Sequence, residues 1–127
     1  MDDFVLGDRE LDVMGVLWDL GSGTVAEVRD KLPADLAYTT VLTILRNLEA
    51  KDLVHHTTEG KAHRYHPRVA RKAARRSALA RVVDKLFHGS PGQLITQLVE
   101  DEQLSTEDLG RLRALLSTQE KKGRTER

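Results

Sequence analysis

The sequence of 127 residues contains no cysteine and only five aromatic side chains (two Phe, two Tyr and one Trp). The absence of cysteine excludes disulfides, thiolate metal sites and thiol redox sensing. No hydrophobic run approaches the roughly 20 residues that a membrane-spanning helix needs, and the acidic start MDDFVLGDRE is unlike a secretion signal. These absences predict a soluble, cytoplasmic protein with one ordinary domain, or a small domain with an appendage.

A net charge is also lacking, because 20 Lys and Arg balance 20 Asp and Glu. Zero net charge argues against a nucleic-acid-binding protein, but the charges are unevenly distributed. Residues 1–35 hold three basic and nine acidic residues, residues 36–76 hold nine and three, and residues 77–127 hold eight of each. The central segment, with its excess of positive charge and four of the five histidines, is therefore the candidate for binding a polyanion.

The segment 36–52, LAYTTVLTILRNLEAKD, has the apolar spacing of a helix. Its predicted buried stripe consists of Val41, Ile44, Leu45 and Leu48. The opposite face is small and polar around a single guanidinium, and consists of Thr39, Thr43, Arg46 and Ala50, flanked by Thr40 and Asn47. Such a helix fits deep in a DNA groove, where Thr bonds phosphate or a base edge and Arg binds guanine. Residues 37–51 are therefore predicted to be a recognition helix.

Leu42 is the exception on this helix, because it lies on the exposed flank. It is predicted either to contact a thymine methyl group or to be a simple surface leucine.

The preceding residues predict the other helices of a helix-turn-helix. Residues 6–20 form a first helix with Gly7 as its N-cap, and its broad apolar face favours core packing of Trp18 over stacking on bases. After Gly21-Ser22-Gly23, the residues TVAE at 24–27 have the spacing of a capping box. They predict a short helix that stops before Pro33. This order of elements is that of a helix-turn-helix.

From residue 53 the periodicity changes to two. Residues 53–58 and 61–67 flank a Glu59-Gly60 turn and predict a β-hairpin. A hairpin directly after a recognition helix is a wing. Lys61 and Arg64 are predicted to flank its tip and to reach phosphates or the adjacent minor groove.

The hairpin also contains two pairs of histidines, His55 with His56 and His63 with His66. The two members of each pair point to opposite faces of a strand. A metal site would need one histidine from each strand and a carboxylate such as Glu59. Structural or phosphate-contacting roles are therefore favoured, and no metal is predicted.

Residues 68–127 predict three more helices, over 68–87, around 94–100 and after the cap at 105–108. The first begins with a basic half, which is either a solvated face or an electrostatic fringe near DNA. These basic residues are Arg68, Arg71, Lys72, Arg75 and Arg76.

The apolar side chains of these three helices are too many for a small appendage to bury alone. A homodimer would bury them, and it would present two recognition helices to a two-fold symmetric operator. The predicted dimerisation residues are Leu79, Val83, Leu86, Phe87, Leu94, Ile95, Leu98, Leu109, Leu112, Leu115 and Leu116.

Several motifs resemble one known family along nearly the whole chain. They are Leu17-Trp18 with Gly21 and Thr24-Val25, the segment AYTTVLTILRNL at 37–48, the wing pattern GKAHRYHP at 60–67 and, more loosely, EQLS at 102–105. The chain thereby resembles the BlaI/MecI family of bacterial penicillinase repressors. The resemblance implies an N-terminal winged helix, a C-terminal helical dimerisation domain and repression through an inverted-repeat operator. No cofactor is predicted.

The resemblance also implies a way to relieve repression. In the family a membrane sensor-protease often cleaves within the helix that corresponds to residues 94–100, and the aligned bond here is Gln97–Leu98.

Asp52 stands where relatives tend to have glycine after the recognition helix. A related branch senses copper through C-terminal cysteines, which this chain lacks.

The sequence therefore predicts a mainly α fold with a small β-hairpin wing. Residues 1–67 form a winged helix-turn-helix domain and residues 68–127 a helical dimerisation domain. The predicted function is a dimeric, sequence-specific transcriptional repressor that binds double-stranded operator DNA through the helix 37–51 and the wing 53–67. The predicted DNA contacts are Thr39, Thr40, Thr43, Arg46, Asn47, Lys61 and Arg64.

Two other classes of function are weaker. The alternative is a winged-helix protein-interaction module without sequence-specific DNA binding, whose basic face meets an acidic partner. An enzyme is least favoured, because the sequence contains no Ser/His/Asp constellation, Gly-rich phosphate loop or metal-spaced His/Glu group.

Overall fold

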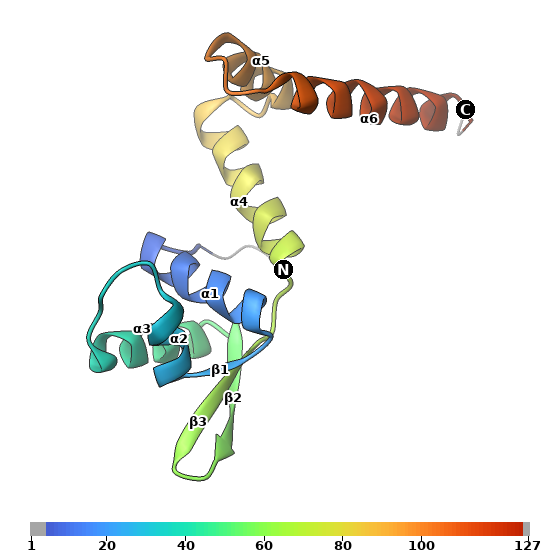
Figure 1. Cartoon of the computed structure of the whole chain (residues 1–127). Coiled ribbons are helices and arrows are strands. Elements are labelled where there is room, and N and C mark those ends of the chain that lie inside the picture. Colours follow the sequence, from blue (N-terminus) through green and yellow to red (C-terminus); the bar gives the residue numbers. More distant parts are fainter. Residues whose placement is uncertain (1–4, 126–127) are drawn as a thin grey trace. The chain divides into compact units, whose positions relative to one another are not determined.

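The computed structural model describes residues 5–125 (Figure 1); residues 1–4 and 126–127, at the outer ends of the two predicted domains, lie outside the described part. The chain divides into two compact units, Met1–Ala80 and Arg81–Arg127. The boundary between these units lies inside a helix whose start is fixed to the first unit, and the predicted domains 1–67 and 68–127 stay a prediction. The Trp18 indole donates to the Val69 carbonyl at 2.8 Å, and Arg71 forms an ion pair with Asp19 at 2.7 Å.

The first helix of the first unit, α1, spans Asp8–Leu20. The Gly7 N–H donates to the Glu10 carboxylate at 2.9 Å, so the helix begins just after the predicted cap. Helix α2 spans Val25–Lys31, and its predicted capping box is confirmed. The Thr24 hydroxyl accepts from the Glu27 N–H at 3.2 Å, and the Glu27 carboxylate accepts from the Thr24 N–H at 3.0 Å.

Helix α3 spans Tyr38–Ala50 and confirms the predicted recognition helix as a structural element. Its four predicted stripe residues, Val41, Ile44, Leu45 and Leu48, are all buried. The helix ends in a Schellman motif, in which the Leu53 N–H donates to the Leu48 carbonyl and the Asp52 N–H to the Glu49 carbonyl. Asp52 has φ +66° there.

The wing consists of β2, Val54–Glu59, and β3, Ala62–Pro67. Glu59 pairs with Ala62, so the turn lies at Gly60-Lys61, one residue later than predicted. A third strand, β1 at Gly23–Thr24, pairs with β3 and gives the order β1-β3-β2. Strand β1 could not be predicted from the sequence, because two residues carry no periodic signal.

One hydrophobic core joins α1, α2, α3 and the base of the wing. In Figure 1 these helices lie around one end of the sheet and the hairpin projects beyond them. Trp18 packs against this core, as predicted. The prediction that Leu42 lies on an exposed flank is wrong, because Leu42 is partly buried against the same core. The buried side of α3 is therefore wider than the apolar spacing indicated.

Helix α4, Arg71–Leu86, crosses from the first unit into the second, which also holds α5, Pro91–Glu100, and α6, Thr106–Thr125. Helix α4 starts three residues later than predicted because β3 runs to Pro67 and Val69 binds Trp18. Helix α5 starts earlier than predicted, since Ser90 is its N-cap and Pro91 opens its first turn. No helix in the described part of the chain is long and apolar enough to cross a membrane.

The second unit buries little of its apolar surface within one chain. Helix α5 has no buried residue. A shallow groove runs between α5 and α6, with Asp108 and Arg111 beside its apolar lining of Ile95, Leu98, Leu104, Leu112 and Leu115. The most exposed predicted dimerisation residues are Leu79, Leu86, Ile95, Leu115 and Leu116. Val83 is buried, and Phe87, Leu94, Leu98, Leu109 and Leu112 are half-buried.

Candidate DNA-binding site

The outer face of α3 presents the predicted DNA contacts together. Thr39, Thr40, Thr43, Arg46 and Asn47 are all exposed, on the side of the helix away from its buried stripe. The Thr43 hydroxyl donates to the Thr39 carbonyl at 2.9 Å. Its proton is therefore engaged, which leaves an acceptor oxygen and a methyl group for a ligand. Such a surface suits an amino group or a methyl group at a base edge.

Arg46 is the only cation among the predicted contacts on α3. Within residues 5–125, no hydrogen bond or ion pair engages its guanidinium. An exposed, unpaired arginine on a surface of small residues can approach a planar acceptor with both terminal nitrogens. The predicted contact of Arg46 with guanine therefore meets no competing partner in the described residues, and it stays a prediction.

Lys61 and Arg64 lie in different surroundings on the wing. Lys61 occupies the hairpin turn next to Gly60 and is exposed. Arg64 lies beside β1, and its guanidinium donates to Glu59 at 2.6 Å and to Glu27 at 2.9 Å. The Arg64 side chain is only 23% exposed. Lys61 is thus free to reach a phosphate, whereas Arg64 connects the wing to the start of α2.

The electrostatics of this Arg64 cluster follow from its contacts. The hydrogen bond from Arg64 lowers the pKa of Glu59. The Thr24 backbone N–H and then the Arg64 side chain lower the pKa of Glu27. The two carboxylates in turn raise the pKa of Arg64. All three groups are therefore charged at neutral pH, and one guanidinium is shared between two strands and a helix.

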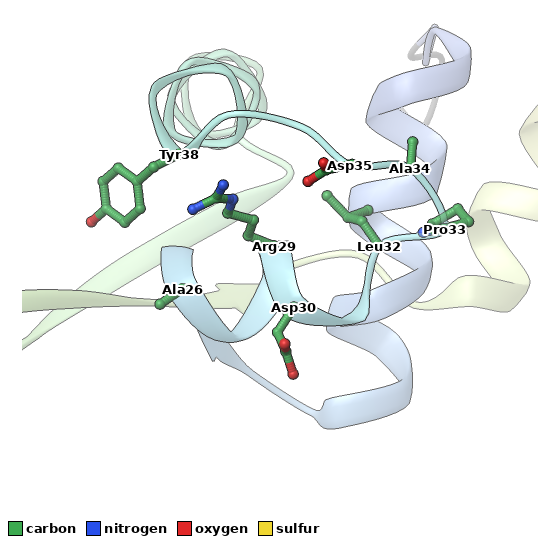
Figure 2. Close-up of a pocket in the computed structure, with 8 residues that line it drawn as sticks. All are labelled: Ala26, Arg29, Asp30, Leu32, Pro33, Ala34, Asp35 and Tyr38. Carbon is green, nitrogen blue, oxygen red and sulfur yellow. The ribbon is translucent and has the colours of Figure 1, made fainter.

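The corner of the helix-turn-helix is held by Arg29, a residue whose role no sequence pattern predicted. Its Nε–H donates to the Leu36 carbonyl at 2.7 Å, just before α3 begins. Figure 2 shows the Arg29 side chain rising from α2 toward the start of α3, while Asp30 points away. The open pocket around it is also lined by Pro33, Asp35 and Tyr38. Arg29 thus fixes the turn that sets where α3 starts.

The basic residues predicted at the start of this helix are partly structural, and the first of them, Arg68, lies before α4 begins. Arg68 forms an ion pair with Asp52 at 3.1 Å, and Arg71 pairs with Asp19 while its guanidinium lies 5.4 Å from the centre of the Trp18 ring. Within the described residues Lys72, Arg75 and Arg76 form no ion pair. The predicted electrostatic fringe is therefore reduced to these three residues and stays a prediction.

The histidines of the wing stack in cross-strand pairs. His55 lies over His66 on one face, with ring centres 4.9 Å apart, and His56 lies over His63 on the other, at 4.2 Å. This confirms that neighbours in sequence point to opposite faces. No group of three His, Asp or Glu side chains in the described part of the chain is placed to hold a metal ion.

The profile of the family described as penicillinase repressor matches residues 6–118. The chain belongs to the penicillinase repressor family. This confirms the resemblance inferred from the motifs at 37–48 and 60–67, and membership in a family of repressors confirms that the chain is not an enzyme.

Individual relatives support the same conclusion. The chain is 48% identical over 65 residues to the transcriptional regulator BlaI of Mycobacterium tuberculosis, a match that covers 49% of this chain. It spans about half the length of that relative, 47%. The solution structure of the DNA-binding domain of the repressor BlaI matches 54% of this chain and 85% of that domain, with 30% identity and a TM-score of 0.50.

A more distant match concerns the fold alone. A MarR family protein from Bacillus stearothermophilus covers 94% of this chain and 76% of its own, with 19% identity and a TM-score of 0.50. Together with the BlaI domain, it supports the predicted fold class, a mainly helical chain with a small sheet and a winged helix-turn-helix.

Proposed function

We propose that this chain is a dimeric, sequence-specific DNA-binding repressor of transcription that occupies an inverted-repeat operator. The observation that carries the proposal is the outer face of α3, where exposed small polar residues surround one unpaired guanidinium. A face that only met water would need neither small side chains nor an unpaired arginine. Such a repressor acts where the genome is, in the bacterial cytoplasm.

In this proposal the contacts divide into base-reading and phosphate-binding groups. Arg46 binds a guanine edge, Thr39 and Thr43 face the groove floor, and Thr40 and Asn47 lie at the groove edges. Lys61 binds a phosphate from the exposed turn of the wing. Arg64 was predicted to do the same, but its two carboxylate partners favour a role in holding the wing.

Dimerisation rests on the second unit. Its groove of leucine and isoleucine between α5 and α6, and the exposed leucines of α4 and α6, are apolar surface that one chain leaves in water. Burial of such a surface against a second copy is favourable by about 25 cal/mol per Å². A two-fold dimer also explains how one recognition helix per chain serves two half-sites.

The test is nuclease footprinting of the DNA upstream of the gene, with the wild type, Arg46→Ala and Arg75→Ala. Arg75 is a matched control, because it is an exposed arginine on α4 without an ion pair in the described residues. We expect two protected half-sites whose centres lie about 10 base pairs, or a multiple of that, apart. Arg46→Ala should lose about 1–3 kcal/mol of operator affinity and relax specificity at one base pair. Arg75→Ala, in the predicted electrostatic fringe, should weaken operator and random DNA alike and leave specificity unchanged.

The alternative, a winged-helix protein-interaction module, predicts a different result. Its basic face would bind duplex DNA only weakly, equally for all sequences, and not at all at high salt. Equal losses for Arg46→Ala on operator and random DNA would remove the base-reading role. If selection from random DNA recovers no preferred sequence, the interaction module becomes the better interpretation.

The inducing partner is also part of the proposal. A membrane sensor-protease, as the family resemblance implies, would have to cut the Gln97–Leu98 bond inside α5. Gln97 donates to Asp101 one turn later at 3.0 Å, and Leu98 is half-buried. A protease binds an extended segment, so α5 must first unwind. A fragment that ends at Gln97, detected by mass spectrometry in induced cells, would identify this route.

A further inference from the structure

One face of the wing lies against the recognition helix and carries a row of aromatic side chains. Pairing of His56 with Tyr65 and of Thr58 with His63 places His56, His63 and Tyr65 on this face. The ring centres of His56 and His63 are 4.2 Å apart, and those of His56 and Tyr65 are 5.7 Å apart. Tyr65 is fully buried in the core, so this row continues the core outward along the hairpin.

The recognition helix supplies a carboxylate to this row. The Nδ1 atom of His56 lies 2.7 Å and 2.9 Å from the two carboxylate oxygens of Glu49, in the last turn of α3. Both side chains are about one third exposed, at 34% and 32%. Glu49 follows Arg46 by three residues, one turn along the same helix. The contact therefore joins the middle of the wing to the end of the helix proposed to read bases.

The charged and titratable groups around His56 come from two elements. Helix α3 contributes Glu49 and, farther away, Arg46, whose charge acts on Tyr65 together with that of Glu49. Strand β3 contributes His63 and Tyr65. Burial and then the charge of Glu49 raise the pKa of Tyr65, so the tyrosine stays neutral near neutral pH. Glu49 and the two imidazoles are thus the groups that set the charge of this cluster.

We propose that Glu49 and His56 form a positioning pair that fixes the wing against the recognition helix, and that protonation of His56 tightens this pair and raises operator affinity as pH falls. The proposal rests on the proposed DNA-binding function. An imidazole normally changes its charge between about pH 5 and 8. A neutral His56 donates one hydrogen bond to Glu49, and a protonated one adds the attraction of opposite charges.

The direction of the effect follows from linkage. In this proposal the tight pair, Glu49 with a protonated His56, belongs to the DNA-bound arrangement of the wing and the helix. The chain therefore takes up protons when it binds DNA, and its affinity for the operator rises as the pH falls. For an ion pair with this exposure, the gain from about pH 8 to about pH 6 should be roughly two- to fivefold. The added positive charge of the other wing histidines acts in the same direction, so a matched control is essential.

The opposite face of the wing provides that control. His55 and His66 form a similar stack, with ring centres 4.9 Å apart, and the Nε2 atom of His66 lies 2.9 Å from the Thr57 hydroxyl. In the described residues neither imidazole forms a hydrogen bond or ion pair with a carboxylate, although the charges of His66 and Glu59 interact. His55→Phe therefore removes one titrating imidazole from the wing but leaves the Glu49–His56 pair intact.

The first experiment follows the histidine ring protons by NMR during a pH titration of the full chain without DNA. In Glu49→Gln, which keeps the size and shape of the side chain, the titration midpoint of His56 should fall. The midpoint of His55 should not move. If the His56 midpoint stays unchanged, the pair does not couple in solution and the proposal is wrong, whatever the chain does with DNA.

The second experiment measures affinity by fluorescence anisotropy at about pH 6 and pH 8, at constant ionic strength, the range in which imidazoles titrate. The probes are the duplex protected in the footprint and a random duplex of equal length. Glu49→Gln and His56→Phe should each remove most of the gain at low pH, and the double variant should remove no more. The readout is the ratio of the affinity for the protected duplex to the affinity for the random duplex, because loss of the negative charge of Glu49 changes both affinities.

Two results of the affinity measurement would also overturn the proposal. One is a His55→Phe variant that loses as much of the gain as His56→Phe, because the effect would then be the total charge of the wing. The other is a Glu49→Gln variant that keeps the gain. A wild type that binds neither duplex at either pH would instead contradict the proposed function, while the NMR titration still tests the pair. Thermal unfolding of each variant identifies any that fails to fold.

Discussion

A single residue, Asp52, turns the chain from the recognition helix into the wing. Its φ of +66° is left-handed, and it occupies the position in the Schellman motif where glycine is most common. Asp52→Gly should therefore raise the free energy of unfolding by up to about 1 kcal/mol. Loss of its exposed ion pair with Arg68 offsets part of this gain, by roughly 0–1 kcal/mol. Urea unfolding of the wild type and the variant measures the net effect.

The variant Asp52→Asn separates the two contributions. Asparagine tolerates the left-handed region about as well as aspartate, but it removes the charge that Arg68 contacts. The difference between Asp52→Gly and Asp52→Asn thus reports the backbone alone. If the glycine variant unfolds at lower urea than the asparagine variant, backbone strain at this position is not significant.

At the scale of elements, Arg64 connects β3 to β2 and to the start of α2 through Glu59 and Glu27. Arg64→Gln should therefore lower the thermal stability of the first unit and leave the dependence of DNA affinity on salt unchanged. Lys61→Gln, at the exposed turn, should do the opposite and reduce the slope of log affinity against log salt by about one unit. Calorimetry and salt titrations of operator binding measure the two effects.

The pH dependence gives an independent test of this connection. The pKa values of Glu27 and Glu59 are both lowered by contacts that include Arg64. A glutamate whose pKa is lowered by folding stabilises the folded chain at pH values above the ordinary glutamate pKa. This stabilisation is lost as the pH falls through the pKa of the glutamate in the folded chain. The stability difference between the wild type and Arg64→Gln should therefore shrink in acid. A reduced salt slope in Arg64→Gln would instead indicate a phosphate contact.

The elements that could be predicted from the sequence are those with a repeated pattern. The buried stripe of α3, the capping box before α2 and the alternation of the wing each place several residues by one rule. The short strand β1, the Arg29 bond to Leu36 and the contact of Glu49 with His56 could not be predicted in this way. They depend on which segments meet in the folded chain, and no local spacing encodes that.

Arg64 was expected to flank the wing tip because its contacts, too, depend on segments that are distant in the sequence. Its position in the hairpin follows from the sequence, but its partner Glu27 lies 37 residues earlier and approaches only because β1 pairs with β3. The outer face of α3 needs no such partner. Its side chains are exposed simply because the opposite stripe is buried, so the candidate base-reading residues were the easier part of the site to predict.

At the scale of the whole molecule, the proposed dimer requires the apolar surface of the second unit. Leu115 is 61% exposed and lines the groove between α5 and α6. Leu115→Glu should place an unpaired charge in the interface and shift the chain from dimer to monomer, because an uncompensated buried charge costs about 3–5 kcal/mol. Sedimentation equilibrium over a range of concentrations measures the shift.

The loss of the dimer should also change how the chain binds DNA. A monomer contacts one half-site and neutralises half as many phosphates, so the slope of log affinity against log salt should fall to about half that of the dimer. Leu11→Glu is the control, because Leu11 lies on α1 in the first unit and is 40% exposed. It should remain dimeric and keep the full slope. A Leu115→Glu variant that is still dimeric would show that two copies associate through another surface, and the spacing of the two half-sites would then have to be derived from that surface.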